Sequence, residues 1–135
     1  MVVAWLAVQE SWRLTLLAYL YMAVCELPSD DPRIQRCVTQ ILKLVDTVKA
    51  DASTGVKVPF FVQYLMAGIC ARSEKHRALV RDKLLDKHES KFWKIRGADF
   101  VPVLDHLWRK VGPDGRPVTW RDYVRSREAM LPVVV

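Results

Sequence analysis

The stretch from Val58 to Leu84 constrains the fold more than any other part of the chain. It begins with a nearly unbroken apolar run, passes Ala67 and Gly68, and then changes to a basic amphipathic pattern. An apolar run predicts a helix that is buried on most sides, whereas apolar residues at three- and four-residue spacing predict a surface helix packed beside it. The stretch therefore predicts two consecutive helices, one in the core and one at the surface.

Helical spacing also recurs outside this stretch, and no segment alternates cleanly at period two. The chain has 135 residues and only five glycines, which argues against a β-rich fold. We predict a single helical domain over residues 1–135, all-α, arranged as an irregular bundle or array of about six helices. The expected helices cover Val3 or Ala4 to Glu26, Pro32 to about Val48, Pro59 to Ala71, the residues after Ser73 up to Leu84, Ala98 to Lys110, and a last helix that follows Thr119.

Helix-start signals support these boundaries. Asp31 precedes Pro32, a residue favoured at the first helical position, and Thr119 with Asp122 forms a capping box. Ser73 is expected to cap the fourth helix, and Asp99 to cap the fifth. In the second helix, apolar residues repeat on one side and place Gln35 on the outer side. The repeating residues are Ile34, Val38, Ile41, Leu42, Val45 and Val48.

The first helix carries large apolar residues at helical spacing, and we expect them to form its buried face. These residues are Trp5, Val8, Trp12, Leu16, Tyr19, Leu20 and Ala23. The apolar run from Leu14 to Cys25 is shorter than the about 20 residues that a membrane span needs, so we predict a core helix and no membrane contact.

The first helix is also apolar on more sides than one neighbour can cover. Large exposed apolar patches usually mark protein contacts. We therefore expect a protein partner or self-association through the first helix and the C-terminal surface formed by residues 132–135. Alternatively, the chain is the C-terminal part of a larger helical domain, whose other helices would cover this surface.

The chain is basic, with 21 lysines and arginines against 15 acidic residues and a net charge of +6. Between Lys87 and Arg96, basic residues alternate with aromatic residues. The aromatic rings could stack on nucleobases while the lysines contact phosphates. The residues of this possible nucleic-acid contact are Lys91, Phe92, Trp93, Lys94 and Arg96. We favour the other interpretation, in which the aromatic rings pack into the core and the lysines are solvated, because no nucleic-acid-binding module surrounds them.

The residues that carry most catalysis and metal binding are scattered. Cys25, Cys37 and Cys70 form no CxxC pair, and no two of His76, His88 and His106 have a metal-site spacing. Apolar surroundings would raise the pKa of the Cys70 thiol, which excludes it as a nucleophile with His76 as base. No phosphate-binding loop occurs. We predict no enzyme activity, no metal and no cofactor, and a reducing compartment.

Four segments, in order, resemble the C-terminal part of the fungal-specific transcription factor domain, the helical regulatory region of fungal zinc-cluster activators. Trp12–Tyr21 is similar to that family's aliphatic-Tyr-Leu helix, and Leu65–Ala71 (LMAGICA) is similar to its FIAG-x-x-A helix, with Arg77 at the usual spacing. Phe100–Trp108 (FVPVLDHLW) is similar to the helix that ends in Trp, and Thr119–Tyr123 to the closing Trp element. One departure is Val62-Gln63, where the family often has Trp-Pro.

The resemblance implies a regulatory, non-catalytic domain in the nucleus. The family reads DNA with a six-cysteine zinc cluster, which these residues lack, so the resemblance implies that direct DNA binding is absent and that the chain is a truncated product or a fragment. It also implies that Arg77 is structural. Independently of the resemblance, a glycine inside a helix costs about 1 kcal/mol relative to alanine, so we expect Gly68 to permit the close approach of a neighbouring helix. A further hypothesis is an unidentified small-molecule effector in a pocket between the first, third and fifth helices, lined by Tyr19, Met66 and Trp108.

Overall fold

The computed structural model describes residues 2–50, 60–85, 97–111 and 115–131, and all regular structure within these ranges is helical. This confirms the predicted all-α fold. The elements are α1 (Val2–Tyr19), the π-helical segment η1 (Leu20–Val24), α2 (Pro32–Ala50), α3 (Phe61–Cys70), α4 (Glu74–Leu84), α5 (Gly97–Val111) and α6 (Trp120–Met130).

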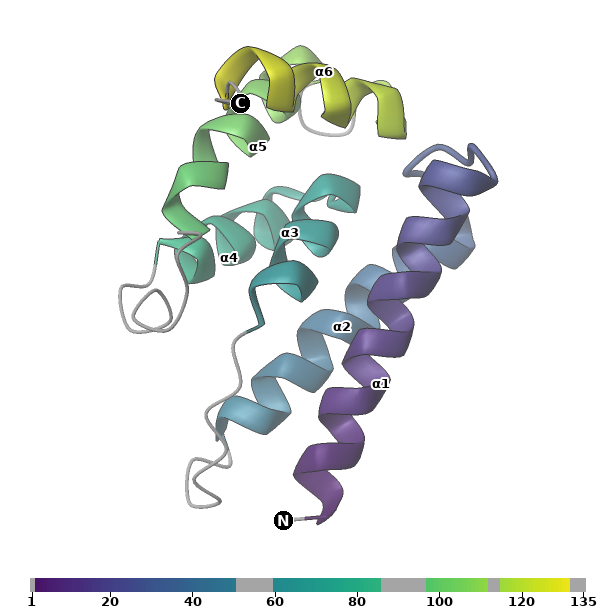
Figure 1. The fold of residues 1–135 in the computed structure, drawn as a ribbon, viewed down its shortest axis with the longest axis vertical. Helices are drawn as coiled ribbons and strands as arrows, with labels where there is room; N and C mark the ends of the chain where they lie inside the picture. Colours follow the sequence, from purple (N-terminus) through teal and green to yellow (C-terminus); the bar gives the residue numbers. More distant parts are fainter. Residues whose placement is uncertain (1, 51–59, 86–96, 112–114, 132–135) are drawn as a thin grey trace.

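The helices are arranged around α3 (Figure 1). α1 and α2 form an antiparallel hairpin, and α5 and α6 lie at the opposite end of the molecule from the N-terminus. α3 packs against α1, α2, α4 and α5. Most of its residues are buried, from Gln63 and Tyr64 to Cys70. The apolar run at the start of the Val58–Leu84 stretch is therefore a central helix, as its composition predicts.

Gly68 lets α3 approach its neighbours closely. A Cβ atom at this position would lie 2.8 Å from Val80 Cγ1 on α4 and 2.9 Å from Leu104 Cδ1 on α5. Carbon atoms in ordinary contact are about 3.5–4.0 Å apart. The predicted role of Gly68 as a packing contact is confirmed.

Three of the four predicted helix starts are confirmed. The Asp31 carboxylate accepts a hydrogen bond of 2.9 Å from the backbone N–H of Arg33, and the Ser73 hydroxyl accepts one of 3.2 Å from the backbone N–H of His76. Thr119 starts α6 with a complete capping box. The prediction for Asp99 was wrong, because α5 begins at Gly97 and Asp99 lies inside its first turn.

The first helix does not run as a uniform α-helix to Glu26. After Tyr19 it changes to a π-helical turn, in which the backbone N–H of Cys25 donates to the carbonyl oxygen of Leu20. Glu26 then adopts a positive φ of 56°, and the N–H of Leu27 donates to the carbonyl oxygen of Tyr21 at 2.9 Å. A left-handed residue followed by such a bond is a helix C-cap that usually employs glycine.

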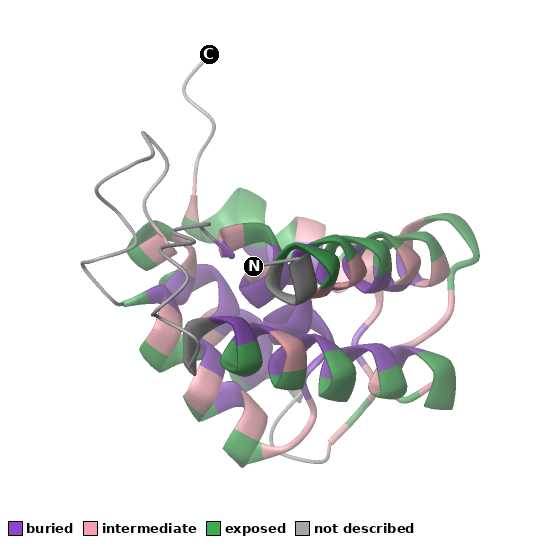
Figure 2. Cartoon of the chain, turned by 90° about the horizontal axis from the view of Figure 1, so that it is seen from below, coloured by how far each residue is buried: buried purple, intermediate pink, exposed green. Residues whose placement is uncertain are grey.

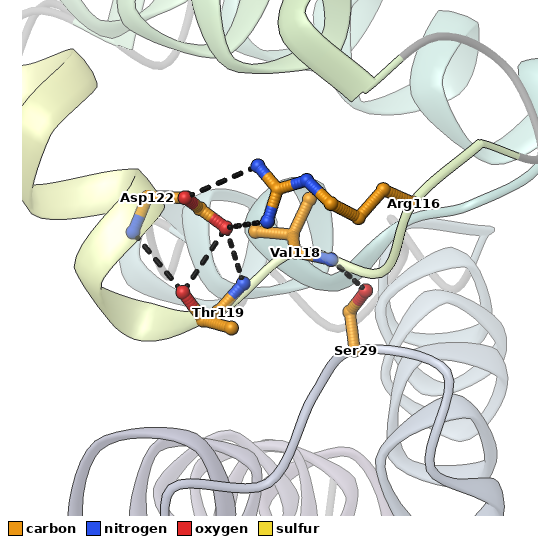
Figure 3. A network of polar contacts seen from close by, with 5 residues as sticks. All are labelled: Ser29, Arg116, Val118, Thr119 and Asp122. Atoms are coloured by element: carbon orange, nitrogen blue, oxygen red, sulfur yellow. Dashed lines mark hydrogen bonds and ion pairs between the residues drawn. The ribbon is translucent and has the colours of Figure 1, made fainter.

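A pair of reciprocal hydrogen bonds ties the α1–α2 hairpin to the start of α6. The N–H of Ser29 donates to the carbonyl oxygen of Val118 at 2.8 Å, and the N–H of Val118 donates to Ser29 Oγ at 2.8 Å. Beside this pair, the guanidinium of Arg116 spans both carboxylate oxygens of Asp122, as Figure 3 shows. Because Ser29 is buried, these bonds hold the turn of the α1–α2 hairpin against the start of α6.

Candidate functional site

The C-terminal end of α3 is a polar node whose bonding explains several predicted residues. The last carbonyl oxygens of a helix lack partners within the helix and need them from elsewhere. Here side chains from three other helices supply them: Trp108 Nε1 on α5 donates to Gly68 O at 3.0 Å, Gln35 Nε2 on α2 to Cys70 O at 2.8 Å, and Arg77 Nε on α4 to Ala71 O at 3.1 Å. The node is therefore an element of the fold.

Two side chains of this node are more buried than helix periodicity predicts. Gln35 was expected on the outer side of its helix, but it is half-buried and also donates to the Ser29 carbonyl oxygen at 2.5 Å. Arg77 is buried and lies over the Trp108 ring, with its Cζ 5.6 Å from the ring centroid. A buried arginine with a carbonyl partner and an aromatic contact fits the structural role that the resemblance implies for it.

The residues proposed for an effector pocket are distributed over two places. Met66 is buried in α3, and Gly68 and Trp108 are in direct contact through the indole hydrogen bond. Tyr19 is partly exposed on α1, and its ring meets the edge of Trp120 on α6 at a centroid distance of 5.3 Å. The structure thus joins Gly68 to Trp108 and places Tyr19 against another helix. The effector pocket stays a prediction.

The most distinctive surface feature is a row of large hydrophobic side chains along α1 and η1. Seven of them are between 39% and 66% exposed. We call this row the α1 apolar face: Trp5, Leu6, Trp12, Leu16, Tyr19, Leu20 and Val24. Figure 2 shows the band of exposed residues on the outer side of the helix that begins at the N-terminus. Outside α1 and η1, the described residues expose only Val62, Leu85 and Met130 in this way.

The α1 apolar face corrects the predicted orientation of the first helix. Of the seven residues expected to be its buried face, Val8 is fully buried and Ala23 partly buried, and the other five are exposed. The side that faces the core combines the larger Leu14 and Met22 with the small Ser11, Thr15 and Ala18. Both hydroxyls donate to carbonyl oxygens of their own helix, Ser11 to Val8 and Thr15 to Ser11, each at 2.7 Å. They are therefore buried without losing a hydrogen bond, and their small size allows close helix packing.

Aromatic contacts extend the α1 apolar face toward α6. Trp120 follows Tyr19 at 5.3 Å, and Tyr123 follows Trp120 at 5.0 Å between ring centroids. Tyr123 is buried, and Trp120 is packed against the core. The exposed row thus ends on a ring cluster that is anchored in the fold.

The α1 apolar face is electrically neutral. Residues 2–24 contain two charged side chains, Glu10 and Arg13. Arg13 Nε donates to Glu10 Oε2 at 2.8 Å, and this hydrogen bond lowers the pKa of the Glu10 carboxyl. The net charge of +6 therefore comes from other parts of the chain.

The possible nucleic-acid contact at 91–96 and the tail at 132–135 lie outside the described residues, so both stay predictions. Within the described residues, no group of His, Cys, Asp and Glu side chains could hold a metal ion. Burial raises the pKa of the Cys70 thiol, as expected for an unreactive core cysteine. No helix in the described part is long and apolar enough to cross a membrane.

Fold and surface together define an all-α domain with a central glycine-containing helix and an exposed apolar helix face. The family model of the fungal specific transcription factor domain matches residues 2–132, and the chain belongs to this family. The family assignment made from the four sequence segments is thereby confirmed, and the chain is a regulatory, transcription-factor-type domain of a family that is not typically enzymatic. No curated protein and no solved structure matches the chain significantly.

Proposed function

We propose that this chain is a non-catalytic regulatory domain that acts in the nucleus through protein contacts at the α1 apolar face. The family membership supports the regulatory role. We infer the contact surface from the row of seven exposed hydrophobic side chains along α1 and η1. Leaving such a row in water costs free energy in proportion to its area, so a partner that covers it gains that free energy on binding.

The proposal assigns DNA recognition to something other than this domain. The chain has three cysteines, fewer than the six of the family's zinc cluster, and two of them are buried. A small-molecule effector that modulates the protein contact is compatible with the proposal; the pocket predicted for it is the one lined by Tyr19, Met66 and Trp108.

A tethered reporter tests the proposal. The chain is fused to an unrelated DNA-binding module in fungal cells, and transcription of a reporter is compared with that of the double variant Trp12→Glu with Leu16→Glu. We expect the reporter signal to change by about tenfold, which corresponds to a loss of about 1.4 kcal/mol of binding free energy. Both positions are exposed, so the variant should fold, and circular dichroism verifies this.

Two matched controls make the same kind of change elsewhere. Leu85→Glu and Met130→Glu introduce a carboxylate at similarly exposed hydrophobic positions outside the α1 apolar face. We expect both to leave the reporter signal unchanged. A signal that is equal in all four proteins would overturn the proposed function.

The alternative function is nucleic-acid binding through the 87–96 segment, favoured by the net charge of +6. An electrophoretic shift assay at several salt concentrations tests it with DNA and RNA. Strong, salt-sensitive binding that disappears in Lys91→Glu with Lys94→Glu would replace the protein-contact proposal as the main account.

A further inference from the structure

We infer that the partner of the α1 apolar face is a second copy of this chain, bound through its own α1 in antiparallel orientation with a two-fold axis at Trp12. The inference uses the surface of the proposed function and names its occupant. Three properties of the α1 apolar face support it: the spacing of its aromatic residues, its charge and its size.

The spacing of the aromatic residues is symmetric about Trp12. Trp5 precedes Trp12 by seven residues, and Tyr19 follows it by seven. Seven residues are nearly two turns of an α-helix, so the three rings lie along one side. In an antiparallel pair with its axis at Trp12, Trp12 meets its own counterpart, and Trp5 of each copy meets Tyr19 of the other. A two-fold interface requires such self-complementarity, because each residue pairing occurs twice.

The charge of the face favours a copy of itself over a charged partner. Two chains of net charge +6 repel each other wherever their basic surfaces meet. The α1 apolar face avoids this repulsion, because its only acid and base, Glu10 and Arg13, neutralise each other. A partner recruited by opposite charge would find no unpaired base on residues 5–24, whereas an equally neutral helix fits.

The size of the face is sufficient for a dimer. Its side chains are 39–66% exposed. Since an aromatic side chain buries about 150–250 Å² when it is covered, the face offers several hundred Å² per copy. A standard protein interface buries about 800 Å² per partner. The row from Trp5 to Tyr19, which this pairing covers on both copies, reaches this order of magnitude together with its rim.

Analytical ultracentrifugation of the whole chain tests the inference. We expect the mass to rise to twice 15.6 kDa as the concentration increases from about 1 to 100 µM. Trp12→Glu with Leu16→Glu should weaken the dimer at least about 100-fold, because it places carboxylates against an apolar surface. Met130→Glu should leave it unchanged. A wild-type monomer throughout this range, or a dimer that the double variant leaves intact, would overturn the inference.

Single cysteines test the orientation. In a Cys25→Ser background, which removes the one exposed cysteine, Trp12→Cys should form a disulfide-linked dimer under mild oxidation. Trp5→Cys should form none alone but should link to Tyr19→Cys in a mixture, because a disulfide needs Cα atoms about 4.4–6.8 Å apart. Efficient self-linking of Trp5→Cys would indicate a parallel pair and contradict the two-fold axis at Trp12.

The two proposals fail in different ways. A monomer whose reporter signal still depends on Trp12 and Leu16 would place a different protein on the face, which overturns the inference and keeps the proposed function. A dimer broken by the double variant with no change in reporter signal would keep the inference and overturn the function.

Discussion

The indole nitrogen of Trp108 on α5 donates a 3.0 Å hydrogen bond to the carbonyl oxygen of Gly68 on α3. The same glycine lacks the side chain that would collide with Val80 and Leu104. One backbone position thus provides both the space for close helix packing and the acceptor that fixes α5. Both residues belong to segments by which the chain resembles its family, which gives that resemblance a physical basis.

Replacement of Trp108 by phenylalanine tests the hydrogen bond. Phenylalanine keeps an aromatic ring but has no donor, so the buried Gly68 carbonyl oxygen loses its bond to α5. We expect the free energy of unfolding to fall by about 1–3 kcal/mol. Urea denaturation measures it, with Met130→Leu at an exposed position outside the α1 apolar face as the control that should change it by less than about 0.5 kcal/mol. Equal effects at the two positions would contradict the assigned role.

Gly68→Ala tests the close approach of α3 to α4. The added methyl would lie 2.8 Å from Val80 Cγ1, so we expect overpacking to cost about 1–3 kcal/mol, against about 1 kcal/mol gained in helix propensity. Val80→Ala removes the colliding methyl. In a double-mutant cycle followed by urea unfolding, Gly68→Ala should therefore cost less in the Val80→Ala background than in the wild type. Additive losses would show that the two positions do not contact each other.

Arg77 and Arg81 lie on the same helix, α4, but in different surroundings. Arg77 is buried with its Nε bonded to the Ala71 carbonyl oxygen, whereas Arg81 forms an exposed ion pair with Asp105. We expect Arg77→Ala to lower the free energy of unfolding by about 2–4 kcal/mol. Arg81→Ala should lower it by less than about 1 kcal/mol, because exposed ion pairs contribute little. Chemical denaturation measures the free energy of unfolding of both variants. Similar losses would contradict the different roles assigned to the two arginines.

Asp122 gives the stability a defined pH dependence. Burial by itself would raise the pKa of its carboxyl, but the Thr119 backbone N–H and then the Arg116 guanidinium outweigh burial, and the pKa lies below the ordinary 3.8. The resulting stabilisation is complete above the unfolded pKa and is lost as the pH falls through the folded pKa. Asp122→Asn should therefore cost about 1 kcal/mol near pH 7 and progressively less below about pH 4. Thermal melts across this range test it; a difference that persists in acid would contradict it.

Glu26 occupies a left-handed conformation that glycine adopts without strain. A non-glycine residue there costs about 1–2 kcal/mol, and part of this is offset because glycine loses more backbone entropy on folding. We expect Glu26→Gly to raise the free energy of unfolding by about 0.5–1 kcal/mol. Glu128→Gly, an interior change on the exposed side of α6, should lower it by a similar amount. Calorimetry compares the two, and destabilisation by Glu26→Gly would contradict the strained C-cap.

The helices and most of their ends could be predicted because their signals are local. Asp31 before Pro32, Ser73 before α4 and the Thr119–Asp122 box each act within one helical turn, so they need no knowledge of the rest of the fold. The start of α5 differs because Asp99 satisfies the same pattern from inside the first turn. The bond of Gln35 could not be predicted, because its partner, the Cys70 carbonyl oxygen, lies 35 residues away on another helix that only the fold brings near. Arg77 is six residues from Ala71, but helix periodicity placed it on the outer side of α4, and its burial comes with the contact to Trp108 on α5.

The sequence by itself determined that this chain is all-α, that α3 is central, and that the chain belongs to its family. Only the tertiary structure decided which side of α1 faces the core. Both sides of that helix are sufficiently apolar, so periodicity cannot choose between them. The choice follows from packing, because Ser11, Thr15 and Ala18 let α1 lie close to its neighbours. Trp5, Trp12 and Tyr19 are bulkier and remain outside, and they form the surface that we propose for the second copy.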